Sequence, residues 1–459
     1  MKMTAKQIAD LCGGRLLCGA PETEVGSVTT DSRSLGDRAL FVPIKGERVD
    51  GHAFLEQVLE NGAAAVLTQE HESASGEKPW IAVPDTREAL QKLAAAYREE
   101  FSIPVVGITG SVGKTTTKEM VALALSAGFS SVLKTAGNLN SQIGLPLMVL
   151  RLSEEYNAAV LEMGMSEFGE MERLAAIAAP QYAVMTNIGI SHIENLKTQE
   201  NIRSEKLHIT DRFTPSSILF LNGDDPLLSE LSGNLPFRTV SFGLGENCDY
   251  SAREIHTDGE STIFLLRAPN GETLQLRLPC LGDHNVRNAL AAVAVADALG
   301  VDRKAAAKAL ETYRPPAMRQ QIRRADGLTV LDDSYNASPD SVRSSLNVLA
   351  SLPCEGKRGA VLADMLELGD LSEQAHYDTG REAAKSGIQF LVTVGHRAEA
   401  IARGALAENP LLDCRVCQSN EEAVRELKAL LGRGDAVLVK GSRGMKTDEI
   451  VTALLGSKT

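Results

Sequence analysis

A repeated alternation of short apolar segments and helix-like stretches is the feature that most constrains how this chain can fold. Apolar runs at 103–108, 158–161, 182–185 and 218–221 are separated by stretches with helical spacing of apolar residues. Parallel strands are covered on both faces, so they are continuously apolar, and each parallel pair needs a crossover connection. The alternation therefore predicts an α/β fold with a parallel sheet between layers of helices.

The same pattern divides the 459 residues into three blocks, in line with about 150 residues per domain. A small α/β domain is expected at 1–84, followed by a connecting helix at 85–102. The central block, 103–314, ends with alternating residues around Asn270–Gly271 that predict a hairpin. After two consecutive prolines, further strand-like runs predict a Rossmann-like α/β domain at 315–459.

Composition limits the possible functions. The formal net charge of -13 argues against non-specific nucleic-acid binding, which needs clustered Lys and Arg. Because we find no apolar run of roughly 18 residues and no signal-peptide core, we expect a cytoplasmic chain that does not insert into a membrane. Seven scattered cysteines argue against a disulfide framework, and we interpret Cys414 and Cys417 as ordinary thiols near a strand.

The segment after the first central strand has the form of a phosphate-binding loop that opens a helix. Its glycines would let backbone N–H groups surround phosphate oxygens, and the helix N-terminus adds positive charge. Lys114 is expected at the β- and γ-phosphates, and the Thr115 hydroxyl at Mg²⁺. The usual first glycine is replaced by Ile108, and the loop alone does not choose between kinase, ATPase, GTPase and ligase. The loop residues are Gly110, Ser111, Val112, Gly113, Lys114, Thr115 and Thr116.

Three further residues each have a chemical and a structural interpretation. Glu162 ends an apolar strand, where a carboxylate would point into the ligand crevice and could hold Mg²⁺; it could also be an ordinary surface carboxylate. His192 follows the strand at 182–185 and is either a metal ligand or a solvated loop histidine. Lys206 lies in a charged helix at 199–211, where a lysine is ordinarily solvated.

The order of these residues resembles the central domain of the Mur ligase family. The resemblance implies ATP and two Mg²⁺ ions as cofactors. Thr115 and Glu162 would hold the first ion, and His192 and a carbamylated Lys206 the second. Carbamylation turns an ammonium group into a carboxylate-like ligand, which makes chemical sense of a lysine at a metal site.

The same resemblance implies further contacts with ATP. The segment 282–290 resembles the family's adenine-side helix, so Asn285 and Asn288 would face the adenine edge. A helix cap with a polar face is the alternative interpretation. Arg319 is expected to reach the phosphates, and Asp333 the ribose, when the last domain closes.

The outer blocks resemble the branch of the family that adds D-alanyl-D-alanine to UDP-N-acetylmuramoyl-tripeptide. In the first block, Arg33 and Lys45 would pair with the diphosphate of the nucleotide sugar. The resemblance implies substrate contacts by Asp31, Ser32, Arg33, Lys45, Asn138 and Asn336. The motifs that carry it are Thr30–Arg33, Phe41–His52, Gly137–Pro146, Asp332–Ser341, Leu362–Gly369 and Val439–Arg443.

The implied activity is ATP-dependent amide ligation through an acyl phosphate, giving the pentapeptide precursor of peptidoglycan. The implied catalytic residues are Lys114, His192, Lys206 and Arg319. The partners would be the two small substrates, and the chain would be a monomer. Alternatives are a ligase that adds a single amino acid (another Mur-type or a folylpolyglutamate-like enzyme), a phosphate-loop ATPase or regulatory module, and a non-catalytic scaffold in wall synthesis.

Overall fold

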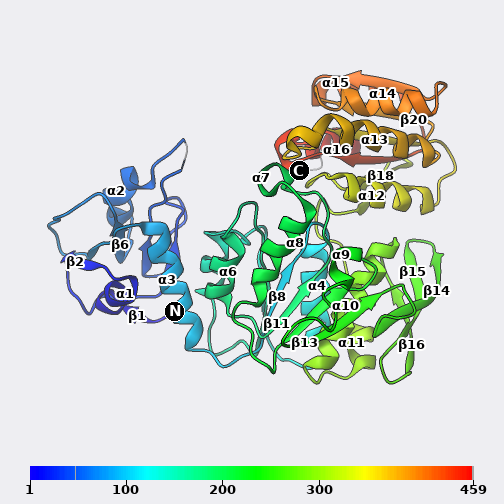
Figure 1. Cartoon of the computed structure of the whole chain (residues 1–459). Coiled ribbons are helices and arrows are strands. Elements are labelled where there is room, and N and C mark those ends of the chain that lie inside the picture. Colours follow the sequence, from blue (N-terminus) through cyan, green and yellow to red (C-terminus); the bar gives the residue numbers. More distant parts are fainter. Residues whose placement is uncertain (47, 457–459) are drawn as a thin grey trace.

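Three parts follow one another along the chain, each built around its own large β-sheet (Figure 1). The computed structural model describes residues 1–46 and 48–456. Figure 1 shows the first part (blue) and the last part (yellow to red) at different sides of the central part (cyan and green). Helices cover the sheets, so the α/β class predicted from the alternation is confirmed. Among the described residues, we find no helix with both the length and the apolar character to cross a membrane.

The first part has a five-stranded sheet of order β2-β7-β6-β5-β4, in which only the β2–β7 pair is antiparallel. The short apolar runs near residues 40 and 65 form β5 and β6. The strands are β1 (Met3–Thr4), β2 (Arg15–Cys18), β3 (Glu24–Val25), β4 (Ser27–Thr29), β5 (Ala39–Phe41), β6 (Ala65–Thr68) and β7 (Trp80–Ala82). The helices are α1 (Ala5–Cys12), η1 (Gly51–Phe54) and α2 (Leu55–Glu60).

The helix α3 (Thr86–Glu99) joins the first and central parts and is held firmly by both. Asp85 caps it by accepting from the Glu88 N–H. The Tyr97 hydroxyl donates to Leu152 O at 2.8 Å, and the buried Arg98 guanidinium donates to Ala178 O at 3.1 Å. One apolar core runs from the first sheet past α3 into the central part. The predicted helix is therefore present, and it is a packed element of the fold.

The central sheet has nine strands in the order β16-β15-β14-β13-β12-β11-β8-β10-β9. The strands from β9 to β13 pair in parallel, and β14, β15 and β16 extend the sheet, with β15 and β16 forming the predicted hairpin around Asn270–Gly271. Alternate side chains of β8 enter two cores, one under α3, α5 and α6 and one under α4, α10 and α11. Helices packed on both faces of the sheet therefore hold the ends of its strands, including the end of β8, in fixed positions.

The central strands are β8 (Val105–Thr109), β9 (Val132–Lys134), β10 (Ala158–Glu162), β11 (Tyr182–Met185), β12 (Ile218–Asn222), β13 (Arg238–Gly243), β14 (Tyr250–Asp258), β15 (Ser261–Arg267) and β16 (Thr273–Leu278). The central helices are α4 (Lys114–Leu125), α5 (Gly144–Val149), α6 (Glu170–Ala178), α7 (Ile193–Leu196), α8 (Gln199–Leu207), η2 (His208–Thr210), α9 (Pro226–Ser229), α10 (Asp283–Ala298) and α11 (Arg303–Leu310).

The last part has a six-stranded sheet of order β17-β18-β22-β19-β20-β21, parallel except for the β17–β18 pair. Its strands are β17 (Gln321–Ala325), β18 (Leu328–Asp332), β19 (Arg358–Ala363), β20 (Phe390–Val394), β21 (Asp413–Cys417) and β22 (Ala436–Lys440). Its helices are α12 (Pro339–Ser351), η3 (Gly369–Leu371), α13 (Ser372–Lys385), α14 (Glu399–Glu408), α15 (Asn420–Leu430), η4 (Arg443–Met445) and α16 (Asp448–Leu455). Cys414 and Cys417, which the sequence places near a strand, lie on β21 itself.

Candidate functional site

The phosphate-binding loop lies between β8 and α4, where the sequence predicts it. Gly110 has φ +146°, and a Cβ there would lie 1.9 Å from the Thr186 Oγ1 atom, so only glycine fits. The Ser111 and Val112 N–H groups donate to the backbone and side-chain oxygens of Asn187 at 3.0 and 2.8 Å. Asn187, which follows β11, thus holds the tip of the loop, and the N-terminus of α4 points at the space in front of the loop.

Lys114 is the first residue of α4, and its half-buried side chain folds back onto the loop. Its Nζ donates to Gly110 O at 2.7 Å and to Ser111 O at 3.3 Å. Burial lowers the pKa of Lys114, the nearby Glu162 carboxylate partly opposes this shift, and the Arg319 guanidinium adds to it. Groups from β10, α4 and the last part of the chain therefore act on one another electrostatically at this point.

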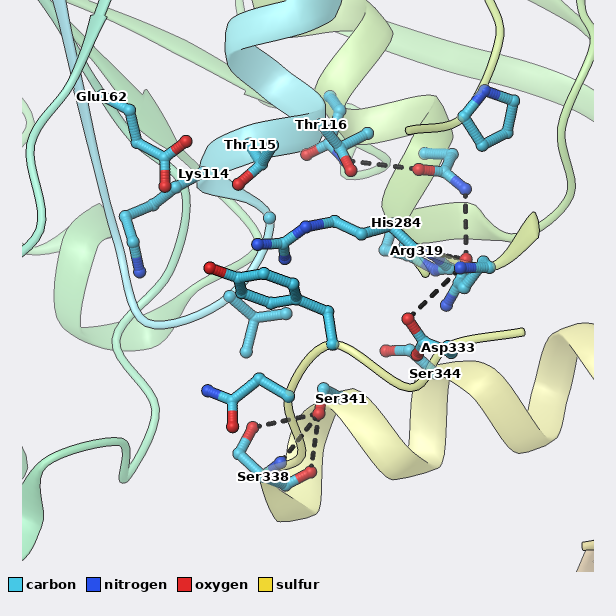
Figure 2. A pocket seen from close by; sticks show the side chains of 18 of the residues that line it. Lys114, Thr115, Thr116, Glu162, His284, Arg319, Asp333, Ser338, Ser341 and Ser344 are labelled. Carbon is cyan, nitrogen blue, oxygen red and sulfur yellow. Dashed lines mark hydrogen bonds between the residues drawn. The ribbon is translucent and has the colours of Figure 1, made fainter. Parts of the chain in front are cut away.

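Glu162 ends β10 and fits the role of a metal ligand. Its Oε1 accepts from Asn140 Nδ2 at 2.8 Å. Its Oε2 is buried and, among the described residues, has no hydrogen-bond partner. A buried carboxylate oxygen without a partner is costly unless a cation completes it. Figure 2 shows Glu162 beside Thr115 and Lys114, so the predicted first pair of Mg²⁺ ligands lies together.

Lys206 and His192 approach the loop from two further elements. Lys206 is 1% exposed, and its Nζ donates to Gly110 O at 3.2 Å, directly behind the phosphate loop. Burial lowers the pKa of Lys206 well below its usual value, Lys114 adds to the shift, and Glu205 opposes it. An uncharged amine is the form that reacts with carbon dioxide, so this environment fits the carbamylated ligand. His192 faces the cavity at the start of α7.

The polar face of α10 is tied to the phosphate helix. Asn288 Oδ1 accepts from the Thr117 hydroxyl at 3.0 Å, and Asn288 Nδ2 donates to Asn285 Oδ1 at 3.4 Å. His284, which the sequence did not single out, has its Nε2 atom 2.7 Å from Gln320 Oε1. The predicted adenine-side residues therefore lie together beside the phosphate loop, at the junction with the last part of the chain.

The last part of the chain contributes the opposite wall. The Arg319 guanidinium lies 4.0 Å from the centre of the Tyr335 ring, a cation–π contact that aims it into the cavity (Figure 2). Asp333 forms a buried ion pair with Lys440 and accepts from the Ser345 hydroxyl at 2.6 Å. A ribose hydroxyl at Asp333 would have to share this carboxylate with those two partners.

These groups line one cavity of about 800 Å³, within the usual range for small-molecule sites. Gly110 and Lys206 lie behind its wall. Of the residues predicted from the sequence, the cavity is lined by Ser111, Val112, Gly113, Lys114, Thr115, Thr116, Asn138, Glu162, His192, Asn285, Asn288, Arg319, Asp333 and Asn336. Asn140, His284, Tyr313, Tyr335 and Lys440 also line it but were given no role. Four of these five lie within the motifs quoted from the sequence, so membership of a motif was the sequence signal that could have identified them.

The predicted nucleotide-sugar residues lie apart from this cavity, in the first part of the chain. Asp31, Ser32 and Arg33 line a separate hollow of about 1060 Å³. Arg33 pairs with Asp31 at 2.9 Å, and this bond lowers the pKa of Asp31 to about 2. Lys45 instead contacts Asp50 and Glu70, at 3.7 and 3.6 Å.

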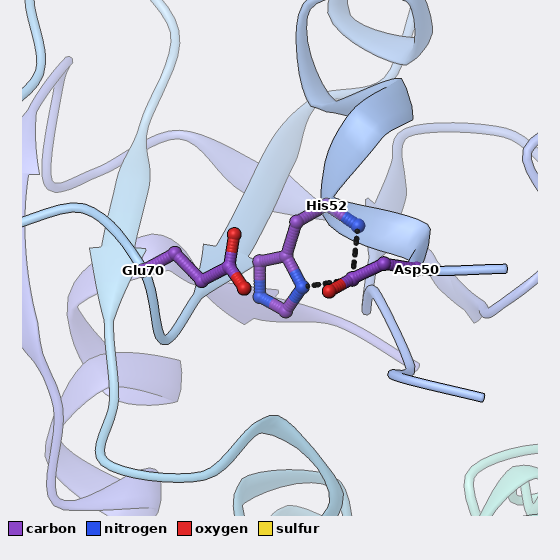
Figure 3. Close-up of side chains that lie close together, drawn as sticks. All are labelled: Asp50, His52 and Glu70. Atoms are coloured by element: carbon purple, nitrogen blue, oxygen red, sulfur yellow. Dashed lines mark hydrogen bonds and ion pairs between the residues drawn. The ribbon is translucent and has the colours of Figure 1, made fainter. Parts of the chain in front are cut away.

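Next to that hollow, His52 has a structural role, because its side chain links neighbouring segments of the first part by hydrogen bonds. Figure 3 shows Asp50, His52 and Glu70 close enough together to suggest a metal site. However, His52 Nδ1 lies 2.7 Å from Asp50 Oδ1, and His52 Nε2 accepts from the Gln69 N–H at 3.3 Å. Both ring nitrogens therefore have protein partners. Glu47, part of the motif quoted for this region, lies outside the described residues.

Comparison with known proteins identifies the family. The profiles of the "Mur ligase family, catalytic domain", the "Mur ligase middle domain" and the "Mur ligase, glutamate ligase domain" match residues 24–98, 108–296 and 318–443. The chain belongs to the Mur ligase family. The three matches fall in the first, central and last parts described above, so this Mur ligase has the family's three-part α/β architecture.

Individual relatives match the Mur ligase from end to end. A Bacillus subtilis protein named UDP-N-acetylmuramoyl-tripeptide--D-alanyl-D-alanine ligase is 40% identical, over 100% of this chain and 99% of the relative. A crystal structure of MurF from Acinetobacter baumannii has a TM-score of 0.91 at 33% identity and covers 99% of each chain. MurF ligase from Thermotoga maritima in complex with ADP has a TM-score of 0.81 at 29% identity, covering 93% of this chain and 96% of that one.

Proposed function

We propose that this Mur ligase is an ATP-dependent amide ligase that joins D-alanyl-D-alanine to UDP-N-acetylmuramoyl-tripeptide. The observation that carries the proposal is the full-length likeness to relatives named for this reaction. The cavity supports it, because phosphate-loop groups and groups from the last part of the chain face one space. The product is the pentapeptide precursor of peptidoglycan.

The chemistry requires activation, because a carboxylate is a poor acylating agent. Transfer of the γ-phosphoryl group of ATP to the terminal carboxylate of the tripeptide gives an acyl phosphate and ADP. The amine of D-alanyl-D-alanine then attacks the carbonyl carbon and loses a proton. The C–O bond to phosphate breaks as the amide forms, and inorganic phosphate leaves. The protein mainly positions the reactants and stabilises negative charge.

Two cavity groups support the charge-stabilising role. Lys114 lies inside the phosphate loop, and Arg319 points at the same place from the last part of the chain. We propose that two Mg²⁺ ions bind here, the first at Thr115 and Glu162 and the second at His192 and carbamylated Lys206. When bound, the ions neutralise charge on the transferring phosphoryl group.

The substrates are proposed to enter from different parts of the chain. UDP would lie in the hollow of residues 1–84, at Asp31, Ser32 and Arg33, and Lys45 would leave Asp50 and Glu70 to pair with the diphosphate. The peptide stem would then extend past α3, at 85–102, toward Asn138.

ATP and the dipeptide would complete the complex in the other two parts of the chain. ATP would bind within 103–314, with its adenine at Asn285 and Asn288 and its ribose at Asp333 of the closing part. D-alanyl-D-alanine would bind within 315–459, near Asn336.

A carbamylated Lys206 has its own test. In a Lys206→Ala variant, activity is expected to fall and to return in part when a short-chain carboxylate is added, because the added group replaces the carbamate. A Lys206→Met variant is the matched control: it also lacks the amine, but its side chain fills the space, so an added carboxylate should not restore its activity. Rescue of neither variant, with both folded normally, would count against the carbamate.

We also propose that the chain works as a monomer in the cytoplasm. The cavity is complete within one chain, so the proposed reaction needs no residue from a second copy. All seven cysteines are free thiols, which suits a reducing compartment.

The decisive assay is phosphate release with ATP and Mg²⁺ under four acceptor conditions and in a control without either substrate. The enzyme receives the tripeptide and the dipeptide together, each alone, or the tripeptide with D-alanine. Release that needs both tripeptide and dipeptide, with a pentapeptide detected by mass, is the expected result. Consumption of a single amino acid would indicate a sister ligase, and release without any acceptor would indicate a bare ATPase.

A further inference from the structure

His192 is contacted by a carboxylate that comes from the last part of the chain. His192 immediately precedes α7, and its Nδ1 atom is in close contact with Oε2 of Glu367, at 2.6 Å, although the two are not aligned as a hydrogen bond; Glu367 lies in the loop between β19 and η3. Both residues have left-handed backbone, with φ +62° and +64°, which is uncommon for residues other than glycine. The surrounding structure therefore holds both side chains in this relation.

The contact lies within a wider junction between the two parts. A Cβ on Gly369 would come within 3.2 Å of the Glu194 backbone, so η3 packs closely on α7. On the other side of His192, a Cβ on Gly189 would lie 2.6 Å from Asp340 Oδ2 of α12. Ile190 packs against the apolar core of the last part. The whole segment that carries His192 is thus in contact with the last part.

The loop that presents Glu367 is itself rigid. The Met365 N–H donates to Nε2 of the fully buried His376 at 2.9 Å. The Leu366 N–H donates to the Ser442 hydroxyl at 2.9 Å, and Asp364 Oδ1 accepts from the Ala398 N–H at 2.7 Å. Glu367 therefore moves with the last sheet as a unit, and its distance from His192 reports where that sheet lies.

We propose that Glu367 is a positioning residue for His192, so that the metal site of the central part is complete only when the last part is docked. A metal-binding histidine almost always directs its second ring nitrogen to a carboxylate or carbonyl oxygen, which fixes the ring and strengthens the ligand. Glu367 meets Nδ1, which leaves Nε2 for the metal. Docking of the last part and binding of the ion are then mutually reinforcing.

This inference rests on the proposed metal role of His192, and Mn²⁺ binding tests both. The probe is Mn²⁺ in the presence of the non-hydrolysable β,γ-methylene analogue of ATP, and free Mn²⁺ is measured by electron paramagnetic resonance. Glu367→Gln keeps the size of the side chain and is expected to weaken the second Mn²⁺ by about tenfold to a hundredfold. Glu373→Gln, an exposed glutamate on α13 that pairs with Arg403, is the matched control and should bind as the parent does.

A double-variant comparison distinguishes positioning from general damage. If Glu367 acts through His192, Glu367→Gln should add no further loss of Mn²⁺ affinity to a His192→Ala chain. Additive losses would overturn the inference. Loss with His192→Ala but none with Glu367→Gln would also overturn it, while an unchanged second site in His192→Ala would instead refute the proposed metal role.

Solution scattering supplies a readout that is independent of metal affinity. With Mn²⁺ and the ATP analogue, the parent should be more compact than the Glu367→Gln variant, because the variant loses the contact that favours docking. Equal dimensions for the two proteins, at matched melting temperatures, would contradict the coupling. The Glu373→Gln control should match the parent.

Discussion

The cavity at the phosphate loop and the hollow in the first part of the chain are built differently. At the cavity, Glu162 is buried and Lys114 is half-buried, Lys206 is buried behind the wall, and elements of the central part hold all three side chains. In the hollow, the Arg33 side chain is 87% exposed and pairs with its neighbour Asp31. The first site is organised before its ligand arrives, whereas the second has to exchange internal ion pairs for ligand contacts.

The difference has an energetic consequence. Buried, fixed charges interact strongly and need little reorganisation, so they suit the stabilisation of a transition state. Exposed ion pairs contribute little by themselves and can be exchanged for a ligand at low cost. The contrast predicts that changes in the cavity lower the turnover rate, while changes in the hollow mainly weaken substrate binding.

The largest expected effect is that of Lys114→Ala. The Lys114 ammonium group lies inside the phosphate loop, where it donates to Gly110 O and Ser111 O, so phosphate release should fall by at least about 10²-fold. Phosphate release with both acceptors measures this loss, and a thermal melt checks the fold. Turnover near that of the parent would contradict the prediction that changes in the cavity act on the turnover rate.

Next in size is Arg319→Ala, which tests the wall supplied by the last part. Arg319 meets the cavity across the Tyr335 ring, so its loss should lower kcat by about 10²-fold with a smaller change in KM for ATP. Tyr335→Phe keeps the aromatic face and serves as the matched control. A change confined to KM would mean that Arg319 only binds the nucleotide.

A smaller effect, on substrate binding and not on turnover, is expected from Arg33→Ala. The KM for the UDP-linked substrate should rise about tenfold, equivalent to ~1.4 kcal/mol, with kcat unchanged. Steady-state kinetics at saturating ATP separate the two constants. Arg38→Ala, another exposed arginine of the first part outside the hollow, should behave as the parent. A fall in kcat for Arg33→Ala would show that the hollow takes part in catalysis.

The smallest effect concerns His376, which supports the loop of the last part from its core. Burial lowers the pKa of His376 below the usual 6.5, so this histidine is protonated more readily in the unfolded chain than in the folded chain. Stability should therefore decrease as the pH falls below about 6.5. Urea unfolding at several pH values should show a shallower decrease for His376→Gln. An identical decrease in both proteins would mean that His376 is not the group responsible.

Much of the architecture could be predicted because its signals are local. The apolar runs Tyr182–Met185 and Phe390–Val394 predict β11 and β20 with the bounds they have. The edge strand β17 was not predicted, and β21 only as a strand near Cys414 and Cys417, since Gln321–Ala325 and Asp413–Cys417 contain charged residues between the apolar ones. An edge strand has one neighbour and more solvent, so it lacks the continuous apolar run.

The site divides in the same way. The phosphate loop is contiguous in sequence, so its glycines and Lys114 could be recognised from their spacing. The burial of Lys206 could not, because α8 is a charged helix of which only one side is buried. The contact of His192 with Glu367 joins two parts of the chain and has no local pattern. It depends on how the sheets are packed together.

The measurement that tests the central claim most directly is isotope transfer from the acceptor. The terminal carboxylate of UDP-N-acetylmuramoyl-tripeptide is labelled with ¹⁸O, and the released phosphate is analysed by mass after one turnover with ATP and D-alanyl-D-alanine. Attack of the carboxylate on the γ-phosphorus, followed by breakage of the C–O bond, predicts one ¹⁸O atom in each phosphate. Phosphate without the label would contradict an acyl phosphate and with it the proposed ligase mechanism.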